Sequence, residues 1–411
     1  MGVAFILKII KGNQQLIRST NLNLIIDLVR RQEPISRADV AKILKLSAPS
    51  VSSNAEQLLS KGILKEVGVG DLVGSGRPPI LLSFNENYGY IVSVDLAGER
   101  IRLALGNLKG NVVAESEIMF TLEEYITSDD LVAVITNIKE LLEINKIPNE
   151  KLMAVCIGTP GILNKETGYF QAAPRFKEWE TINIHQIMKK EFNTTVMVIN
   201  DMNLFIIGES RYGAGRGFSN LLGINVDIGI GAGIIIQGQL YEGSRLAAGE
   251  VGYWVCGTPD FDEPSRLKDY YLDSHLSLHA LMHKVRVDLR NGQTSKILDY
   301  CQNNLEKVTF EAFCKAAADQ DPYCLRKTKE LAQSLSVVLV NMSLLLDLEL
   351  IVIGGDIKKL GYLFIQPLRE LVNKMVPLTT TIVYAEHGEH SGIHGGFAVA
   401  LDHVMSNILS E

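Results

Sequence analysis

The segment from residue 35 to residue 67 constrains the fold of this 411-residue chain more than any other. Its apolar residues recur at helical spacing on either side of a tight turn at Leu46, which predicts two short helices. Ser47 follows the turn and is a favourable N-cap for the second helix. Such a pair makes a helix-turn-helix, although a plain helical hairpin has the same pattern. The apolar positions are Val40, Ile43, Leu44, Val51, Ala55, Leu58 and Leu59.

The second helix is expected to present short side chains outward near its N-terminus. Side chains of this kind can contact base edges and phosphates in the major groove of DNA. The candidate DNA-binding residues on this helix are Ser47, Pro49, Ser50, Ser52, Ser53 and Asn54.

The residues after this helix indicate a β-ribbon with a glycine-rich tip, which is typical of the wing of a winged helix. Its end contains the sequence SGRPP, in which the prolines keep the backbone extended. Arg77 would project from a segment thin enough for the minor groove, and a narrow A·T-rich groove attracts arginine. Gly76, Arg77 and Pro78 are therefore candidate DNA contacts, while the same prolines would also suit a stiff linker between domains.

Charge is distributed unevenly along the chain. Residues 1–80 contain 11 Lys and Arg against 6 Asp and Glu, a net charge of +5. The remaining residues contain 29 against 41, a net charge of −12, and the whole chain carries −7. A basic head on an acidic body is expected when only the head contacts nucleic acid.

The composition is that of a globular protein, with 46% hydrophobic and 21% charged residues. We expect no signal peptide and no membrane segment, because no stretch approaches the roughly 20 apolar residues of a membrane helix. The five cysteines are scattered without CxxC spacing, which favours a reducing cytoplasm and no disulfides. The chain is therefore expected to be cytoplasmic.

From Tyr88 onward the pattern becomes α/β, and the second half repeats the plan of the first. Each half opens with an apolar strand that ends in a polar or glycine-rich turn, which suggests two lobes with a cleft between them. Ligands in such sheets bind beyond the carboxyl ends of the strands. The predicted strands lie at residues 90–95, 101–107, from 112 onward, at 153–158, 196–199, 220–225 and 234–236, and within 350–356, where a glycine turn follows the strand.

Polar side chains at these strand ends form the candidate ligand site. Asn200 and Asp201 directly follow a predicted buried strand, where a carboxylate is costly without partners. Glu250 stands between glycines, so little would shield it from a ligand. Each residue could instead be an ordinary turn or cap residue. Together they suit a ligand with many hydroxyl groups, because carboxylates accept and amides both donate and accept hydrogen bonds.

The order and spacing of several motifs resemble the ROK family of sugar kinases and sugar-responsive repressors. The matching motifs are SGRPP, VSVDLAG, GTPGILN, VINDMN, GIGAGIIIQGQLYEG, AAGEVGYW, IVIGGDI and GIHGGFA. The resemblance implies a winged helix at residues 1–73, a wing or linker at 74–84, and an actin-like α/β body. The body would comprise lobe 1 at 85–202 and lobe 2 at 203–411, with a C-terminal helix that could return to lobe 1.

The chain departs from the kinases of this family at the phosphate loops. Glu99 stands where the first loop carries a hydroxyl residue, and its charge would repel a phosphate. Ile228 stands where the second loop carries Thr or Ser. Asp201 matches the kinase general base, yet these losses argue against ATP binding, so we expect no catalysis and no cofactor.

The zinc site of the family is also incomplete in this chain. Tyr253 occupies the position of the histidine ligand, and Cys256 alone remains of the cysteines, so no metal is expected. The family's further sugar-binding glutamate has no clear counterpart, although Asp262 or Glu263 could replace it. The candidate sugar-binding residues are Asn200, Asp201, Glu250, Tyr253, Arg175 and Thr159.

These features predict a sugar-responsive transcriptional repressor that binds a palindromic, A·T-rich DNA operator. A sugar or oligosaccharide bound to the body would release it, and a homodimer, or a tetramer, would match the palindrome. The alternatives are an active ATP-dependent sugar kinase of the ROK type and a structural DNA-binding protein whose body only dimerises.

Overall fold

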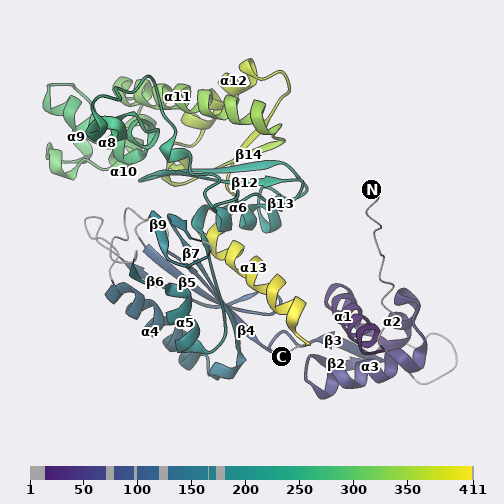
Figure 1. The fold of residues 1–411 in the computed structure, drawn as a ribbon. Helices are drawn as coiled ribbons and strands as arrows, with labels where there is room; N and C mark the ends of the chain where they lie inside the picture. Colours follow the sequence, from purple (N-terminus) through teal and green to yellow (C-terminus); the bar gives the residue numbers. More distant parts are fainter. Residues whose placement is uncertain are drawn as a thin grey trace, which may run out of the picture. The chain divides into compact units, whose positions relative to one another are not determined.

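The computed structural model describes residues 14–70, 78–96, 100–119, 128–164, 166–172 and 181–409. The chain forms two compact units (Figure 1). The first comprises Met1–Ile91, Gly106–Asn111 and Leu401–Glu411, and the second comprises Val92–Leu105 and Val112–Ala400.

The described helices and strands alternate along most of the chain. The helices are α1 (Gln14–Gln32), α2 (Arg37–Leu44), α3 (Ala48–Ser60), α4 (Ser128–Ile144), α5 (Ile184–Phe192), α6 (Asp201–Tyr212), α7 (Asp273–Leu276), α8 (Leu278–Arg290), α9 (Ile297–Tyr300), α10 (Phe310–Ala318), α11 (Pro322–Leu346), α12 (Tyr362–Met375) and α13 (Ser391–Asn407). The strands are β1 (Ile35–Ser36), β2 (Leu64–Val69), β3 (Ile80–Phe84), β4 (Tyr90–Asp95), β5 (Arg100–Asn107), β6 (Val112–Met119), β7 (Leu152–Thr159), β8 (Ile162–Leu163), β9 (Phe170–Ala172), β10 (Thr195–Asn200), β11 (Leu221–Val226), β12 (Ile230–Ile236), β13 (Gln239–Leu240), β14 (Leu350–Gly354) and β15 (Thr381–Tyr384).

The first unit contains the expected helix pair, α2 and α3, with a third helix, α1, packed against both. Ser47 caps α3 as predicted, because its Oγ accepts a hydrogen bond of 3.3 Å from the backbone N–H of Ser50. The inner face of α3 buries Val51, Ala55 and Leu58. The helix α1 is an addition to the predicted helix-turn-helix, and its buried side chains complete the small core. These side chains are Leu22, Ile25, Ile26, Leu28 and Val29.

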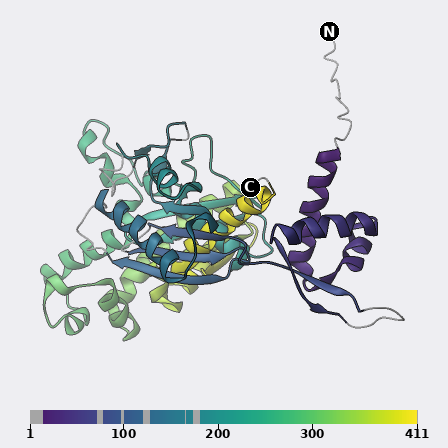
Figure 2. The ribbon, with the colours of Figure 1, turned by 90° about the horizontal axis from the view of Figure 1, so that it is seen from below.

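The strands β2 and β3 form an antiparallel hairpin next to this core, with β1 on the other side of β3. Figure 2 shows the hairpin, in dark blue, extending from the helices. A bulge between Glu66 and Gly68 shifts its register. The hairpin occupies the position of the predicted wing.

The turn between β5 and β6 and the end of α13 belong to this same first unit. Lys109 in the turn pairs with Glu33 and lies 3.8 Å from a carboxylate oxygen of Glu86. The backbone N–H of Leu108 donates to the carbonyl of Glu86 at 3.0 Å. A Cβ built on Gly110 would lie only 3.2 Å from a methyl carbon of Leu401. These contacts make the turn and the helix end part of the winged-helix fold.

The second unit is built on two five-stranded sheets, which confirms the predicted two-lobed α/β body. One has the strand order β10-β7-β4-β5-β6 and the other β13-β12-β11-β14-β15. In the first sheet β10 runs parallel to β7, and in the second β14 runs parallel to β11 and β15. The predicted hairpin turn at Gly238 joins β12 to β13.

The helix α6 contacts strands of both sheets, namely β7 and β10 in one and β11 and β12 in the other. Its backbone approaches α13 closely, because a Cβ on Gly208 would lie 2.0 Å from the carbonyl oxygen of Ser391. The helix α13 in turn lies against β4, where a Cβ on Gly396 would lie 2.0 Å from the Ser93 hydroxyl (Figure 1). A side chain at Gly208 would clash with α13, so the backbones of α6 and α13 are in direct contact, and a side chain at Gly396 would clash with β4.

The helix α11 is the longest of those described and passes through the core of the second sheet's lobe. By length and composition alone it could cross a membrane, but half of that apolar stretch is buried inside the protein. Leu331, Leu335, Leu339 and Met342 belong to the same buried cluster as Ile351 of β14. Core packing therefore accounts for its hydrophobicity.

Candidate functional site

The exposed face of α3 carries four of the six predicted DNA contacts. Ser47, Pro49, Ser52 and Ser53 are exposed, and Ser50 is half-buried. The expectation that Asn54 faces outward is wrong, because its exposed fraction is only 4%. Position 54 follows Val51 by three residues and therefore falls on the inner face of the helix.

The end of the wing is only partly described. Pro78 is half-buried, whereas Gly76 and Arg77 lie outside the described residues. At the base of the wing, the guanidinium of Arg37 at the start of α2 donates a hydrogen bond of 3.0 Å to Glu66 of β2. This ion pair joins the helix-turn-helix to the base of the wing.

Asn200 and Asp201 lie where β10 ends and α6 begins, as the sequence predicts. The Asn200 Oδ1 caps the helix, accepting from the backbone N–H groups of Met202 at 2.9 Å and Asn203 at 3.2 Å. The Asn200 amide nitrogen donates to the carbonyl of Gly161 at 3.4 Å. This cap fixes the position of Asp201, the first residue of the helix.

The carboxylate of Asp201 has few hydrogen-bond donors to offset the cost of its burial. Its Oδ1 accepts a backbone hydrogen bond from Met202 at 2.9 Å, and the residue's own backbone N–H also donates to the carboxylate. Burial raises its pKa to about 6, and these two hydrogen bonds only partly oppose the shift. Near neutral pH the side chain therefore loses and gains a proton easily.

Glu250 lies close to Asp201, although it comes 49 residues later in the chain. Its pKa is raised to about 7, mainly by burial and in smaller part by the charges of Asp201 and Asp273. The preceding Gly249 has φ +91°, and a Cβ there would lie 2.0 Å from the carbonyl oxygen of Ala232. This glycine lets the loop pass directly over β12 and brings Glu250 to the site.

Asp273 is the third carboxylate of the group and was not predicted. It begins α7, and its Oδ1 accepts a hydrogen bond of 2.6 Å from the backbone N–H of Ile230. Burial also raises its pKa. The sequence suggested Asp262 or Glu263 as replacements for the family's further sugar-binding glutamate. Both side chains are exposed, so neither takes the position that Asp273 occupies. Asp201, Glu250 and Asp273 are called the carboxylate cluster below.

Tyr253 lies at the edge of the carboxylate cluster. Its ring meets that of Tyr271 edge-on, with centroids 5.5 Å apart, and 43% of the residue is exposed. Burial raises the pKa of its hydroxyl, and the charges of Glu250 and Asp273 add to the shift. The phenol therefore stays protonated and can donate a hydrogen bond to a ligand.

Two other predicted ligand residues are not placed at the cluster. Thr159 pairs with Asn200 across β7 and β10, but its side chain is fully buried. Its hydroxyl has no hydrogen-bond partner among the described residues. Arg175 lies outside the described part of the chain, as does Glu99 of the first phosphate loop.

Ile228 of the second phosphate loop is half-buried, and its backbone N–H donates to Asp227 at 3.0 Å. Its side chain offers no hydroxyl to a phosphate. Among the described residues no group of three or more His, Cys, Asp or Glu side chains is arranged to hold a metal ion.

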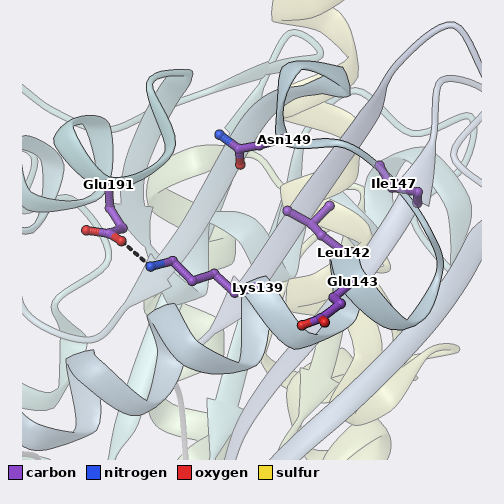
Figure 3. Close-up of a pocket in the computed structure, with 6 residues that line it drawn as sticks. All are labelled: Lys139, Leu142, Glu143, Ile147, Asn149 and Glu191. Carbon is purple, nitrogen blue, oxygen red and sulfur yellow. Dashed lines mark hydrogen bonds and ion pairs between the residues drawn. The ribbon is translucent and has the colours of Figure 1, made fainter.

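A separate pocket of about 320 Å³ lies between α4 and α5 (Figure 3). An ion pair between Lys139 and Glu191 crosses it, and Leu142 and Ile147 form its apolar side. The residues of the carboxylate cluster do not line this pocket.

Comparison with known proteins gives a match to the ROK family over residues 91–403. The xylose repressor of Caldicellulosiruptor bescii is 29% identical over 88% of this chain and 90% of its own length. The glucokinase of Thermotoga maritima is 25% identical over 98% of its own length but only 76% of this chain.

Among solved structures, a ROK family transcriptional regulator homologous to the Mlc protein of Escherichia coli has the same fold. Its TM-score is 0.76 at 23% identity, and the match covers 96% of this chain and 98% of that one. The kinase-like body and the winged helix are thus both present in a single known architecture.

Proposed function

Since this chain belongs to the ROK family, we propose that it is a sugar-responsive transcriptional repressor of the bacterial cytoplasm. The winged helix binds a palindromic, A·T-rich operator, and a sugar or oligosaccharide bound at the carboxylate cluster releases the protein from DNA. The observation that carries this proposal is that one chain holds two features. One is an exposed recognition helix without an acidic residue in its first turn. The other is a cluster of carboxylates whose burial is only partly offset by hydrogen bonds.

The chemistry of the carboxylate cluster supports a sugar as the ligand. Three carboxylates can accept hydrogen bonds from several hydroxyl groups at once, and the hydroxyl of Tyr253 can donate one. The oxygen of Asn200 already caps α6, so this side chain can offer a ligand only the second N–H of its amide. Hydroxyl donors would also compensate the buried charges of Asp201 and Glu250. The ligand residues that we propose are therefore Asn200, Asp201, Glu250, Tyr253 and the added Asp273.

The operator contacts are proposed for the start of α3 and for the wing. Ser47, Ser52 and Ser53 would contact bases or phosphates, and Arg77 would enter the minor groove. Because an operator palindrome mirrors a two-fold protein, we propose a homodimer as the DNA-binding form.

The test starts from full-length protein and a randomised duplex DNA library, from which the bound operator is selected. Operator affinity is then measured by fluorescence anisotropy with and without D-xylose, D-glucose and sucrose. We expect at least one sugar to weaken operator binding by a factor within the usual 5–150-fold range of allosteric coupling. Selection of no sequence, or a sugar that tightens binding, would contradict the proposal.

An active sugar kinase is the second candidate, and the raised pKa of Asp201 favours it because a general base works best with a pKa near neutrality. The missing hydroxyl at Ile228 opposes it. Sugar-dependent ATP hydrolysis on the order of 1 per second, abolished by Asp201→Asn, would establish this alternative.

A further inference from the structure

Glu209, near the C-terminal end of α6, is a fully buried carboxylate that the sugar and DNA sites do not use. Both of its oxygens are saturated with donors. Oε2 accepts from the backbone N–H groups of Ala214 and Glu386, each at 3.0 Å. Oε1 accepts from the N–H of His387 at 3.0 Å and from the Ser391 hydroxyl at 2.6 Å.

Three of these four donors belong to the segment that starts α13. Glu386 and His387 precede the helix, and Ser391 is its first residue. The carboxylate therefore holds the start of α13 against the end of α6, across 177 to 182 residues of sequence. The fourth donor, Ala214, closes the turn that ends α6.

The backbones of α6 and α13 are in close contact where the two helices meet. A Cβ on Gly208 would lie 2.0 Å from the Ser391 carbonyl oxygen, and one on Gly395 would lie 1.9 Å from the Leu204 carbonyl oxygen. Close-packed interiors shift as units rather than compress. A displacement of α6 must therefore move the start of α13.

The other end of α6 carries Asp201 of the carboxylate cluster. Asp201 and Glu209 are eight positions apart in the helix, which corresponds to about 12 Å along its axis. The other end of α13 belongs to the first unit, in which Leu401 lies against Gly110 in the turn between β5 and β6. One continuous path of two helices thus runs from the cluster to the unit that holds the winged helix.

We infer that Glu209 is a positioning residue that couples the carboxylate cluster to the DNA-binding unit through α13. This inference rests on the proposed function and adds the route by which ligand binding reaches the operator contacts. Glu209 touches neither ligand nor DNA, so its loss should uncouple the two sites while leaving each able to bind.

The test compares Glu209→Gln with wild type in the full chain. The amide keeps the shape of the side chain but in either orientation turns an NH₂ group toward at least one backbone N–H, which cannot accept a hydrogen bond. We expect operator affinity without sugar and sugar affinity without DNA to change by less than about threefold, while the coupling factor falls from its 5–150-fold range to below about threefold.

Asp321→Asn is the matched control. Asp321 is also buried and accepts two backbone hydrogen bonds of 2.8 Å, from Lys296 and Cys324, but it caps α11 away from this path. It should reduce stability and keep the coupling factor. Ser391→Ala, which removes one donor only, should reduce the coupling partly and serves if Glu209→Gln does not fold.

Hydrogen exchange adds a measurement that needs no sugar. In Glu209→Gln, amides of residues 401–408 should exchange roughly tenfold faster or more, and in Asp321→Asn they should not change. Unchanged exchange in Glu209→Gln, or an unchanged coupling factor, would overturn the inference. If no sugar affects wild-type operator binding, the proposed function is wrong, and the exchange of residues 401–408 alone decides whether Glu209 controls α13.

Discussion

The two ends of α6 both hold carboxylates, but their charges are satisfied very differently. At the N-terminal end Asp201 accepts backbone hydrogen bonds only from Met202 and from its own N–H, and it lies near Glu250. At the C-terminal end Glu209 accepts four hydrogen bonds in a fully buried place. The helix dipole favours an anion at the first end and disfavours one at the second, so the donors around Glu209 also offset an unfavourable field.

The difference separates a carboxylate that maintains the fold from one that is available to a ligand. A saturated carboxylate stabilises the structure that surrounds it. A poorly compensated one costs stability and persists where a function uses it. Four predictions test this contrast, from the largest expected effect to the smallest.

Glu209→Ala should lower the free energy of unfolding by about 3–5 kcal/mol, because it leaves the backbone N–H groups of Ala214, Glu386 and His387 without an acceptor. Asp201→Ala should change it by less than about 1 kcal/mol. Urea unfolding followed by circular dichroism measures both variants. Equal losses at the two positions would show that both ends of the helix are structural.

Asp201→Ala and Glu250→Ala should still bind the operator but should no longer release it when sugar is added. The lost coupling corresponds to about 1–3 kcal/mol. Fluorescence anisotropy with and without the sugar gives this value for each variant. Release equal to that of wild type would place the sugar away from the carboxylate cluster.

Glu250→Gln should become more stable relative to wild type as pH rises, by about 1–2 kcal/mol between pH 4.5 and 7.5 after allowance for solvent screening. The pKa of Glu250 is raised from 4.5 to about 7. Such a group contributes stability below its unfolded pKa and loses it as pH rises through the folded one. The glutamine does not titrate, so thermal unfolding in half-unit pH steps should show a widening difference between the two proteins. A constant difference would mean that Glu250 is not perturbed.

Ser391→Ala should lower stability by about 1 kcal/mol, since it removes one of four hydrogen bonds to Glu209. Ser391 is fully buried, and the alanine fits the same space. Chemical unfolding of the variant measures the change. A loss of stability as large as that of Glu209→Ala would mean that this single hydroxyl accounts for the contact between the end of α6 and the start of α13.

The regular elements could be predicted where residues near in sequence determine them. The strand predicted at residues 90–95 and the two helices predicted on either side of Leu46 agree with the structure, since buried strands show continuous apolar runs and amphipathic helices show a 3.6-residue period. Asn54 shows the limit of this approach. It is polar, yet its spacing from Val51 places it on the buried face of α3.

The site could be predicted only in part, for a related reason. Asn200 and Asp201 are recognisable because they directly follow a buried strand. Asp273 is not, because it joins Glu250 through the fold, after an exposed segment without clear periodicity. The role of Glu209 depends on donors some 180 residues away in the chain, and helical spacing gives no sign of them.

The first unit takes its residues from three separate parts of the chain. This limits how the protein could have evolved by joining domains and where the chain can be cut into fragments that fold. A fragment ending near residue 91 would lack Lys109, the partner of Glu33, and Leu401, which covers Gly110. The DNA-binding head is therefore not a portable module. Grafting it onto another body would require transfer of the β5–β6 turn and the end of α13 as well, so specificity for DNA and the identity of the body should be inherited together.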